Sequence, residues 1–174
     1  MKNICIVAGE PNSINSEIIA KSWLKLKIAD RKKLIIIGNY NLIKLQLKKL
    51  KYKIDLEKTN ILNQTIKNKL RIYDISFKKN KLSKYIKDSL NKAHELAIKR
   101  KIKGFINCAI DKSNLPNQNG VTEYLSSKNK NNFFKNMLIY NEKISVVPLT
   151  THIELKKVSN KLNKKFIIKK IKDL

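Results

Sequence analysis

The sequence predicts an α/β protein in which a mainly parallel sheet is flanked by helices, beside a smaller part of mixed strands. Two patterns support this prediction. Short apolar runs, such as residues 34–37, have the length of buried strands. Between the first two runs, Ile19, Trp23 and Leu26 recur at helical spacing. The resulting strand–helix–strand–helix order is typical of a parallel sheet, because parallel neighbours are joined by crossover connections that are usually helical.

The elements of the first half follow in a simple order. They are a strand over residues 3–8, a loop over 9–16 with Asn and Ser suited to helix N-caps, a helix over 16–29, a strand over 34–37 and a helix around 43–50. Residues 51–80 give a weaker pattern, in which alternating Tyr73, Ile75 and Phe77 predict one strand.

The second half continues in the same way. We expect a helix over 82–100, a strand over 104–110, a loop over 111–120, a short helix capped by Thr122, paired strands at 137–140 and 145–149, and a last helix through Phe166. Neither an internal repeat nor a long linker is evident, so residues 1–174 are predicted to form a single α/β unit. The helical pattern continues to the last residues, which predicts a truncated chain.

The formal net charge of +26 invites a nucleic-acid-binding interpretation. We do not expect a nucleic-acid partner, because only Arg31, Arg71 and Arg100 among the 39 basic residues are arginine, the residue that contacts phosphate and guanine bidentately. The lysines are also dispersed. Three segments nearly lack them: residues 1–20, 104–127 and 144–154. We therefore expect a solvated lysine surface on helix faces, away from the loops that carry chemistry.

Cysteine use and hydropathy indicate a cytoplasmic protein. Cys5 and Cys108 lie in apolar, strand-like runs, which favours buried, reduced thiols over a disulfide framework. No apolar run approaches the roughly 18 residues of a membrane span. The apolar N-terminal stretch is too short for a signal peptide.

Four segments, in order, resemble the 4-hydroxythreonine-4-phosphate dehydrogenase (PdxA) family. Residues 9–17, GEPNSINSE, resemble the family's GEPAGIGPE. Residues 104–112, GFINCAIDK, resemble a strand that ends in TAPINK or TGPVHK. Residues 120–125, GVTEYL, are similar to GHTEFL, and residues 150–155, TTHIEL, are similar to TTHIPL. The resemblance covers the whole chain but only the first half of a typical family member.

The resemblance implies a fold like that of isocitrate and isopropylmalate dehydrogenases, cut short. It also implies an enzyme of vitamin B6 synthesis that oxidises 4-hydroxythreonine 4-phosphate with NAD, and a divalent metal held by three histidines. His152 matches the first of these ligands, and the other two belong to the half that is absent here. Family members are homodimers with the active site built across the interface. Activity of this chain alone is therefore not expected, and a second copy or a complementing half is the implied partner.

The substrate-binding residues implied by the resemblance are Thr122, Val121 and Lys112. Thr122 matches the family's Thr, but Val121 replaces a His and can neither hydrogen-bond nor titrate. Lys112 is the only lysine of residues 104–127, and either a phosphate contact or an ordinary surface position suits it. Catalytic and NAD-contacting residues are not identified, because GxGxxG is absent. His94, the other histidine, matches no ligand and is expected on a helix surface.

Three functions stay open at this point. The first is a family dehydrogenase acting on a small phosphorylated substrate, with its remainder supplied elsewhere. The second is a non-catalytic remnant or partner module that keeps the fold and loses the metal chemistry. The third is a basic nucleic-acid-binding protein, which would bind its partner in a salt-sensitive way.

Overall fold

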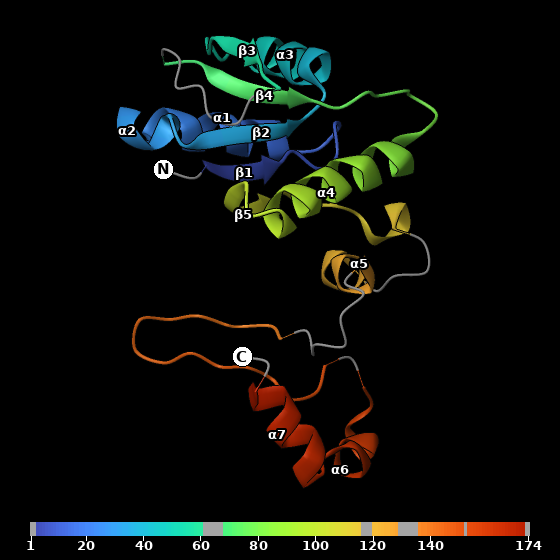
Figure 1. Ribbon diagram of the computed structural model, residues 1–174. Coiled ribbons are helices and arrows are strands. Elements are labelled where there is room, and N and C mark those ends of the chain that lie inside the picture. Colours follow the sequence, from blue (N-terminus) through green and yellow to red (C-terminus); the bar gives the residue numbers. More distant parts are fainter. Residues whose placement is uncertain (1–2, 61–67, 116–119, 129–135, 152, 173–174) are drawn as a thin grey trace. The chain divides into compact units, whose positions relative to one another are not determined.

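The computed structural model describes residues 3–60, 68–115, 120–128, 136–151 and 153–172 (Figure 1). The chain divides into two compact units, Met1–Leu125 and Ser126–Leu174. Each unit is described by itself below, and the prediction of a single unit stays a prediction.

The first unit is built on a five-stranded, wholly parallel sheet. Its strands are β1 (Asn3–Val7), β2 (Leu34–Gly38), β3 (Leu56–Lys58), β4 (Leu70–Asp74) and β5 (Ile102–Asn107), in the order β3-β4-β2-β1-β5. Runs such as Leu-Ile-Ile-Ile suit these strands, because both faces of a parallel sheet are covered. The predicted α/β class is thereby confirmed.

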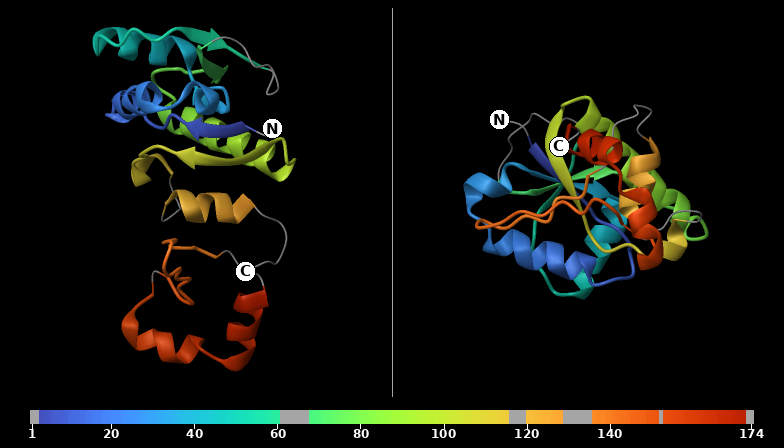
Figure 2. Two further views of the ribbon diagram at one scale, coloured as in Figure 1. Left: turned by 90° about the vertical axis from the view of Figure 1, so that its left-hand side faces the viewer. Right: turned by 90° about the horizontal axis from the view of Figure 1, so that it is seen from below.

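Helices cover both faces of this sheet (Figures 1 and 2). On one face lie α1 (Asn15–Lys25) and α3 (Tyr40–Lys49), which pack on Ile36, Leu70 and Ile72. On the other lies α4 (Leu82–Ile98), which packs on Cys5, Val7, Ile35 and Ile37, and α5 (Val121–Lys128) adds Tyr124 to the same cluster. The neighbours Ile35, Ile36 and Ile37 thus point alternately into the two cores, as the period-2 geometry of a strand requires.

Several predicted boundaries in the first unit are wrong. The predicted helix over 16–29 breaks near Leu26 into α1 and the four-residue α2 (Ile28–Arg31). The predicted strand at Tyr73–Phe77 ends earlier, as β4, and Ile75 and Phe77 pack on the core from beyond its end. The sequence pattern missed β3 altogether, because three residues are too few to show a period.

Helix starts also differ from the prediction. Ile14 occupies the N-cap of α1 without a side-chain bond, although the Ser13 hydroxyl accepts from the Asn15 amide at 3.2 Å. Thr122 lies inside α5 and is not its cap. By contrast, the side chain of Asn39 caps α3, accepting from the Leu42 amide at 3.1 Å.

The second unit contains little regular structure. The predicted paired strands at 137–140 and 145–149 are wrong, because only the isolated antiparallel bridge Ile139–Val146 forms there. This bridge is the described part of the predicted mixed-strand region. The predicted last helix is broken into a 3-10 turn, η2 (Leu155–Lys157), and the helices α6 (Val158–Lys161) and α7 (Lys164–Lys172). Within the described residues, no helix is long and apolar enough to cross a membrane.

Candidate functional site

The carboxyl ends of β1 and β5 form the part of the sheet best suited to a ligand. The two strands are neighbours, yet the chain leaves β1 towards α1 on one face and leaves β5 towards α5 on the other. In open α/β sheets, the crevice at such a topological switch point is where ligands bind. The loops after these two strands carry the first two family-like segments, residues 9–17 and 104–112.

Glu10 joins these two loops. One of its carboxylate oxygens, Oε1, accepts from the backbone amide of Asp111 at 2.6 Å and from the Asn114 amide group at 2.8 Å. The hydroxyl of Ser13 donates to the Glu10 carbonyl at 2.8 Å, which fixes the backbone of the loop after β1. Glu10 therefore has a structural role, in which one acceptor closes two loops that are about a hundred residues apart in sequence.

Gly9 and Asn15 also hold together the loops that follow β1 and β5, a contact region called the loop junction below. Gly9 has φ of +70°, and a Cβ there would stand 2.6 Å from both the Ala109 carbonyl oxygen and the Asn15 side-chain nitrogen. The Asn15 amide donates to the Ala8 carbonyl at 3.1 Å and to the Ala109 carbonyl at 2.8 Å. Glycine is needed at position 9 for close approach and for its left-handed backbone.

Asn15 is the residue of this junction that sequence reasoning missed. It stands where the family-like segment has a glycine, begins α1 and uses its side chain as a bridge. The side chain is 1% exposed, and its Oδ1 meets no donor among the described residues. No local sequence signal marks this role, because only the pairing of β1 with β5 brings the Ala8 and Ala109 carbonyls together.

Lys112 begins the 3-10 turn η1 (Lys112–Asn114) in the loop that follows β5, and its side chain is exposed. The preceding Asp111 accepts from the Ser113 amide at 2.8 Å, and this bond, with the Ser113 side chain, lowers the pKa of Asp111. At the other end of the turn, the Ser83 hydroxyl of α4 donates to the Asn114 carbonyl at 2.8 Å. Helix α4 therefore holds the turn that presents Lys112.

The same helix holds α5, where the other two predicted substrate contacts lie. The Tyr124 hydroxyl donates to the Asn91 side chain of α4 at 2.8 Å, and the Tyr124 ring is buried in the core. Thr122 is exposed, whereas Val121 is partly buried and packs against that core. Lys112 and Thr122 thus stand on two elements anchored to one helix, and Val121 faces the apolar side.

A second polar cluster lies at the ends of β2 and β4. Asp74 accepts from the Tyr40 amide at 2.8 Å and from the Lys58 ammonium at 2.8 Å, and the Asn39 amide donates to the Ile75 carbonyl at 2.9 Å. The Tyr85 hydroxyl accepts from the Asn39 backbone at 3.1 Å, and burial raises the Tyr85 pKa. These bonds fix the starts of α3 and the β4–α4 connection.

The predicted metal ligand, His152, lies outside the described residues, so its position relative to the other site residues stays a prediction. His94 lies on α4 and is partly exposed. Across the described ranges, no group of three or more His, Cys, Asp or Glu side chains could hold a metal ion. These residues alone therefore do not make a metal centre.

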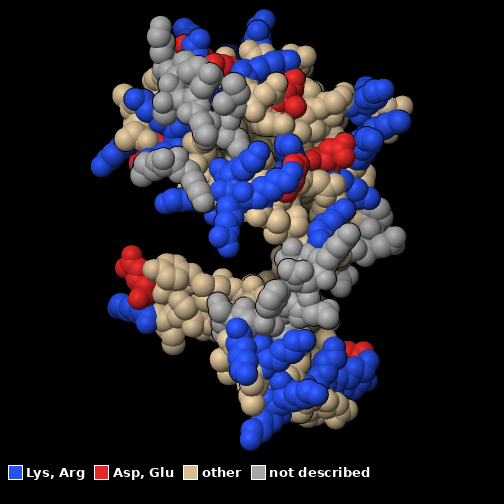
Figure 3. Space-filling view, viewed as in Figure 1, with Lys and Arg blue, Asp and Glu red and all other residues tan. Residues whose placement is uncertain are grey.

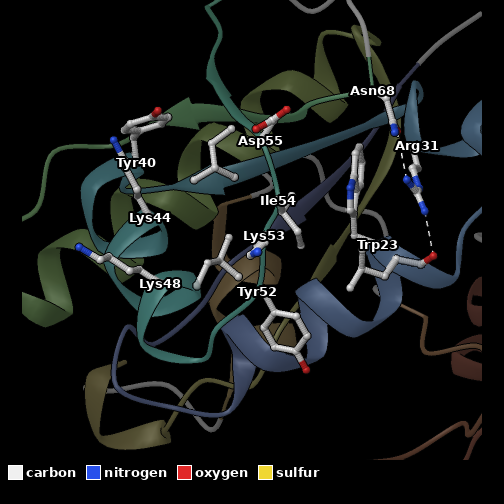
Figure 4. A pocket seen from close by; sticks show the side chains of 13 residues that line it. Trp23, Arg31, Tyr40, Lys44, Lys48, Tyr52, Lys53, Ile54, Asp55 and Asn68 are labelled. Carbon is white, nitrogen blue, oxygen red and sulfur yellow. Dashed lines mark hydrogen bonds between the residues drawn. The ribbon is translucent and has the colours of Figure 1, made fainter.

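A hollow of about 680 Å³ lies away from the switch point, beside α1, α3 and the segment that leads into β3 (Figure 4). Arg31 lines it, stacked 5.5 Å from the centroid of the Trp23 ring, but its guanidinium donates to the Leu24 and Leu26 carbonyls and to Asn68. Of the predicted site residues that the structure describes, Lys112, Val121 and Thr122, none lines this hollow. Arg31 therefore has a structural role, in which its guanidinium is occupied by bonds within the fold. The topological switch point between β1 and β5 remains the candidate site.

Comparison with known proteins places this architecture in a family. The family model for the pyridoxal phosphate biosynthetic protein PdxA matches residues 25–174. A 4-hydroxythreonine-4-phosphate dehydrogenase from Hydrogenobaculum sp. (strain Y04AAS1) is 30% identical over 99% of this chain. The chain spans 57% of the length of that relative.

Solved structures resemble the fold closely. A protein from Salmonella typhimurium, provisionally named a 4-hydroxythreonine-4-phosphate dehydrogenase, superposes with a TM-score of 0.83 at 21% identity, over 99% of this chain and 58% of that one. A 4-hydroxythreonine-4-phosphate dehydrogenase from Burkholderia phymatum gives 0.80 at 14% identity, over 99% and 56%. The family model covers most of the chain, and the chain therefore belongs to the PdxA family of pyridoxal phosphate biosynthetic proteins.

Proposed function

We propose that this chain supplies the first half of an oxidoreductase that converts 4-hydroxythreonine 4-phosphate with NAD in pyridoxal 5'-phosphate biosynthesis. The observation that carries the proposal is the switch point between β1 and β5. There, Glu10 and Asn15 hold the two loops together, and α4 anchors the turn that carries Lys112 and, through Tyr124, the helix that carries Thr122. The name of the Hydrogenobaculum relative supports the same reaction.

In this proposal, Lys112 attracts the phosphate or carboxylate of the substrate, since an exposed ammonium on an anchored turn is a suitable point charge. Thr122 offers a hydroxyl that can both donate and accept a hydrogen bond. Val121 supplies only apolar contact. The chain's own part is then to bind and orient the substrate at the sheet edge.

The proposed reaction also uses a divalent metal, which would stabilise negative charge on the reacting oxygens. We assign His152 as one ligand. The described residues do not provide the others, so in this proposal they come from outside residues 1–174.

The proposed partner is a second copy of the chain. In the second unit, large apolar side chains of the arm around the Ile139–Val146 bridge are exposed: Leu138, Ile139, Tyr140, Ile144 and Val146. Glu142 and Lys143 are the only charged residues of 137–149, and their charges cancel. The electrostatic repulsion expected between two chains of net charge +26 is therefore weaker at this arm. Sedimentation should therefore detect a dimer that Ile144→Lys dissociates.

The test of the proposed reaction is NADH formation from 4-hydroxythreonine 4-phosphate, followed by absorbance with Mg²⁺, Mn²⁺ or Zn²⁺ present. The chain alone should be inactive. Co-expression with the part of the Hydrogenobaculum relative outside the matched 57% should give metal-dependent activity. Lys112→Ala should raise KM by about tenfold or more, because a charge-assisted contact contributes about 1.5–3 kcal/mol. Lys49→Ala, an exposed lysine of α3, should leave KM unchanged.

A non-catalytic partner module is the second candidate, and Val121 favours it, because valine replaces the family's His and packs against the core. The absence of NADH in every complementation, despite purification of both parts as one complex, would support this alternative. Nucleic-acid binding has weaker support, since Figure 3 shows Lys and Arg side chains spread over the visible faces of both units.

A further inference from the structure

The hollow beside α1, α3 and the segment that leads into β3 lies apart from the site of the proposed reaction. Its volume of about 680 Å³ is within the range of about 300–1,000 Å³ that is usual for sites of small ligands. In the sheet, β2 and β4 separate β3 from β1, and β3 stands at the edge opposite β5. The hollow is thus separated from the switch point at β1 and β5 by the width of two strands.

Backbone hydrogen bonds hold one wall of this hollow in place. The Tyr52 amide donates to the Leu47 carbonyl at 3.0 Å, and the Leu70 amide donates to the Asp55 carbonyl at 2.8 Å. Both ends of the segment 52–55 are therefore fixed, one to α3 and the other to β4. The side chains of this segment are positioned before a ligand binds, which lowers the entropic cost of binding.

Flat and apolar side chains form the inner part of the hollow. Trp23 and Leu47, each 3% exposed, belong to the core cluster on this face of the sheet. Tyr40, Tyr52 and Ile54 are partly buried and pack against the same cluster. Surfaces of this kind bind the flat ring of a ligand, because burial and offset stacking both favour the contact.

Basic side chains dominate the charged groups of the hollow. Lys44 and Lys48 lie one turn apart on α3 and are exposed, as is Lys53. Among the described residues, no acidic side chain forms an ion pair with these three lysines. Figure 4 shows Lys44 and Lys48 on one side of the hollow and Arg31, whose guanidinium is bonded to the fold, on the other. This distribution of charge matches an anion that carries more than one negative charge.

Asp55 is the single carboxylate among the described residues that line the hollow. Its side chain is exposed and labelled in Figure 4. In a site that recognises charge alone, a carboxylate would oppose the binding of an anion. In dinucleotide sites, however, a carboxylate accepts hydrogen bonds from ribose hydroxyls. Asp55 therefore suits a ligand that has sugar hydroxyls as well as anionic groups.

We propose that this hollow binds a nucleoside phosphate, a ligand that combines a flat ring, sugar hydroxyls and a multiply charged anion. The ring contacts the apolar inner part, Asp55 accepts from the sugar, and Lys44 and Lys48 contact the phosphates. Because two strands separate the hollow from the switch point, this ligand is distinct from the coenzyme of the proposed reaction. The inference therefore goes beyond that reaction and does not depend on it.

Trp23 provides the test, because it is the single tryptophan of the chain and lines the hollow. Its fluorescence is followed while the chain is titrated with ADP in about 0.15 M salt, which screens exposed charges beyond about 8 Å. The fluorescence change should saturate. Inorganic diphosphate, measured by competition with ADP, should have a dissociation constant about tenfold higher, because it lacks the ring and the sugar.

Two double variants of equal charge separate the hollow from the general positive surface. Lys44→Gln/Lys48→Gln should raise the dissociation constant of ADP by about tenfold or more, because two charge-assisted contacts are lost. Lys25→Gln/Lys49→Gln, at exposed positions of α1 and α3 outside the hollow, should change it by less than about twofold. Asp55→Ala should weaken ADP binding, whereas the loss of a carboxylate from a site for charge alone would tighten it.

Several results would overturn the proposal. The first is the absence of ADP binding in fluorescence and in calorimetry alike. Equal weakening in the two double variants would indicate non-specific attraction to a chain of net charge +26, and tighter binding by Asp55→Ala would indicate an anion site without nucleoside recognition. In a complemented enzyme that forms NADH, a higher KM for NAD in Lys44→Gln/Lys48→Gln would place the coenzyme in the hollow and overturn the assignment of a separate ligand. Specific ADP binding by a chain that forms no NADH in any complementation would count against the proposed reaction and support this inference.

Discussion

The two units of the chain differ in how they bury apolar surface. Among the residues that the structure describes, every buried apolar side chain lies within residues 1–125, in two clusters on the faces of the sheet. Among the described residues of the second unit, Lys170 is the buried side chain, while Leu155 is 88% exposed and Ile144 is 70% exposed. The second unit has similar apolar residues, but its described part contains no cluster of buried apolar side chains. Hydrophobic content alone therefore does not make a folded unit, and topology decides whether it can be buried.

Core truncation should separate the two units most clearly. Leu90→Ala truncates a wholly buried side chain of α4 and should lower the free energy of unfolding by about 3 kcal/mol. Leu155→Ala, at an exposed position, should change it by less than about 0.5 kcal/mol. Urea unfolding followed by the fluorescence of Trp23, the single tryptophan, measures the first unit in both variants. Similar losses in the two variants would contradict the comparison.

The next largest effect is expected at the loop junction of the first unit. Gly9→Ala forces a side chain into a left-handed backbone and against the Ala109 carbonyl, and should cost about 2 kcal/mol. Gly104→Ala is the matched control. Its Cβ meets open space, so the loss of backbone freedom in the unfolded chain should stabilise the protein by up to about 1 kcal/mol. Thermal unfolding of the two variants should shift in opposite directions.

The Glu10 bridge should contribute less than the backbone at Gly9. Glu10→Ala leaves the Asp111 amide and the Asn114 side chain without their acceptor and should lower stability by about 1.5 kcal/mol. Glu17→Ala, which removes only a surface pair with Lys21, should cost about 0.3–0.5 kcal/mol. Hydrogen exchange should also speed up at the Asp111 amide in Glu10→Ala but not in Glu17→Ala. Equal stability losses would indicate that Glu10 does not join the two loops in solution.

Surface charge should have the smallest effect. Glu95 pairs with Lys99 at 2.7 Å and with Lys92 at 3.1 Å, and these partners lower its pKa from 4.5 to about 2. Because the folded-state pKa is depressed, the stabilisation is present above pH 4.5 and is lost as the pH falls towards 2. Its side chain is 42% exposed, so solvent screening limits the contribution to a few tenths of a kcal/mol. The difference in urea midpoint between wild type and Glu95→Gln should shrink over this range, and a constant difference would argue against the pairs.

Much of the first unit could be predicted from sequence, because its signals are local. The run Leu34–Gly38, the helical period of residues 82–98 and the cap at Asn39 each depend on neighbours in the chain. The candidate site was only partly predictable. Lys112 and Thr122 were found through family-like motifs, whereas Asn15 and Asn114 act on partners that are 94 and 104 residues away.

In the second unit, local sequence patterns predicted the secondary structure poorly. Its alternating and helical patterns predicted two strands and one continuous helix, but the structure has one bridge and short helices. Local propensity is weak, and most of the stability of a strand or helix comes from the surface on which it packs. The described part of this unit offers no buried apolar surface on which the predicted strands and helix could pack.

The sequence by itself determined the α/β class, the α4 helix, the lysine-rich surface and membership of a family that the comparisons confirmed. Only the tertiary structure decided that Glu10 and Asn15 join the loops after β1 and β5, and that Val121 packs inwards. The physical reason is that composition and periodicity report what each residue prefers. A hydrogen bond between distant loops exists only after the strands have been ordered in space.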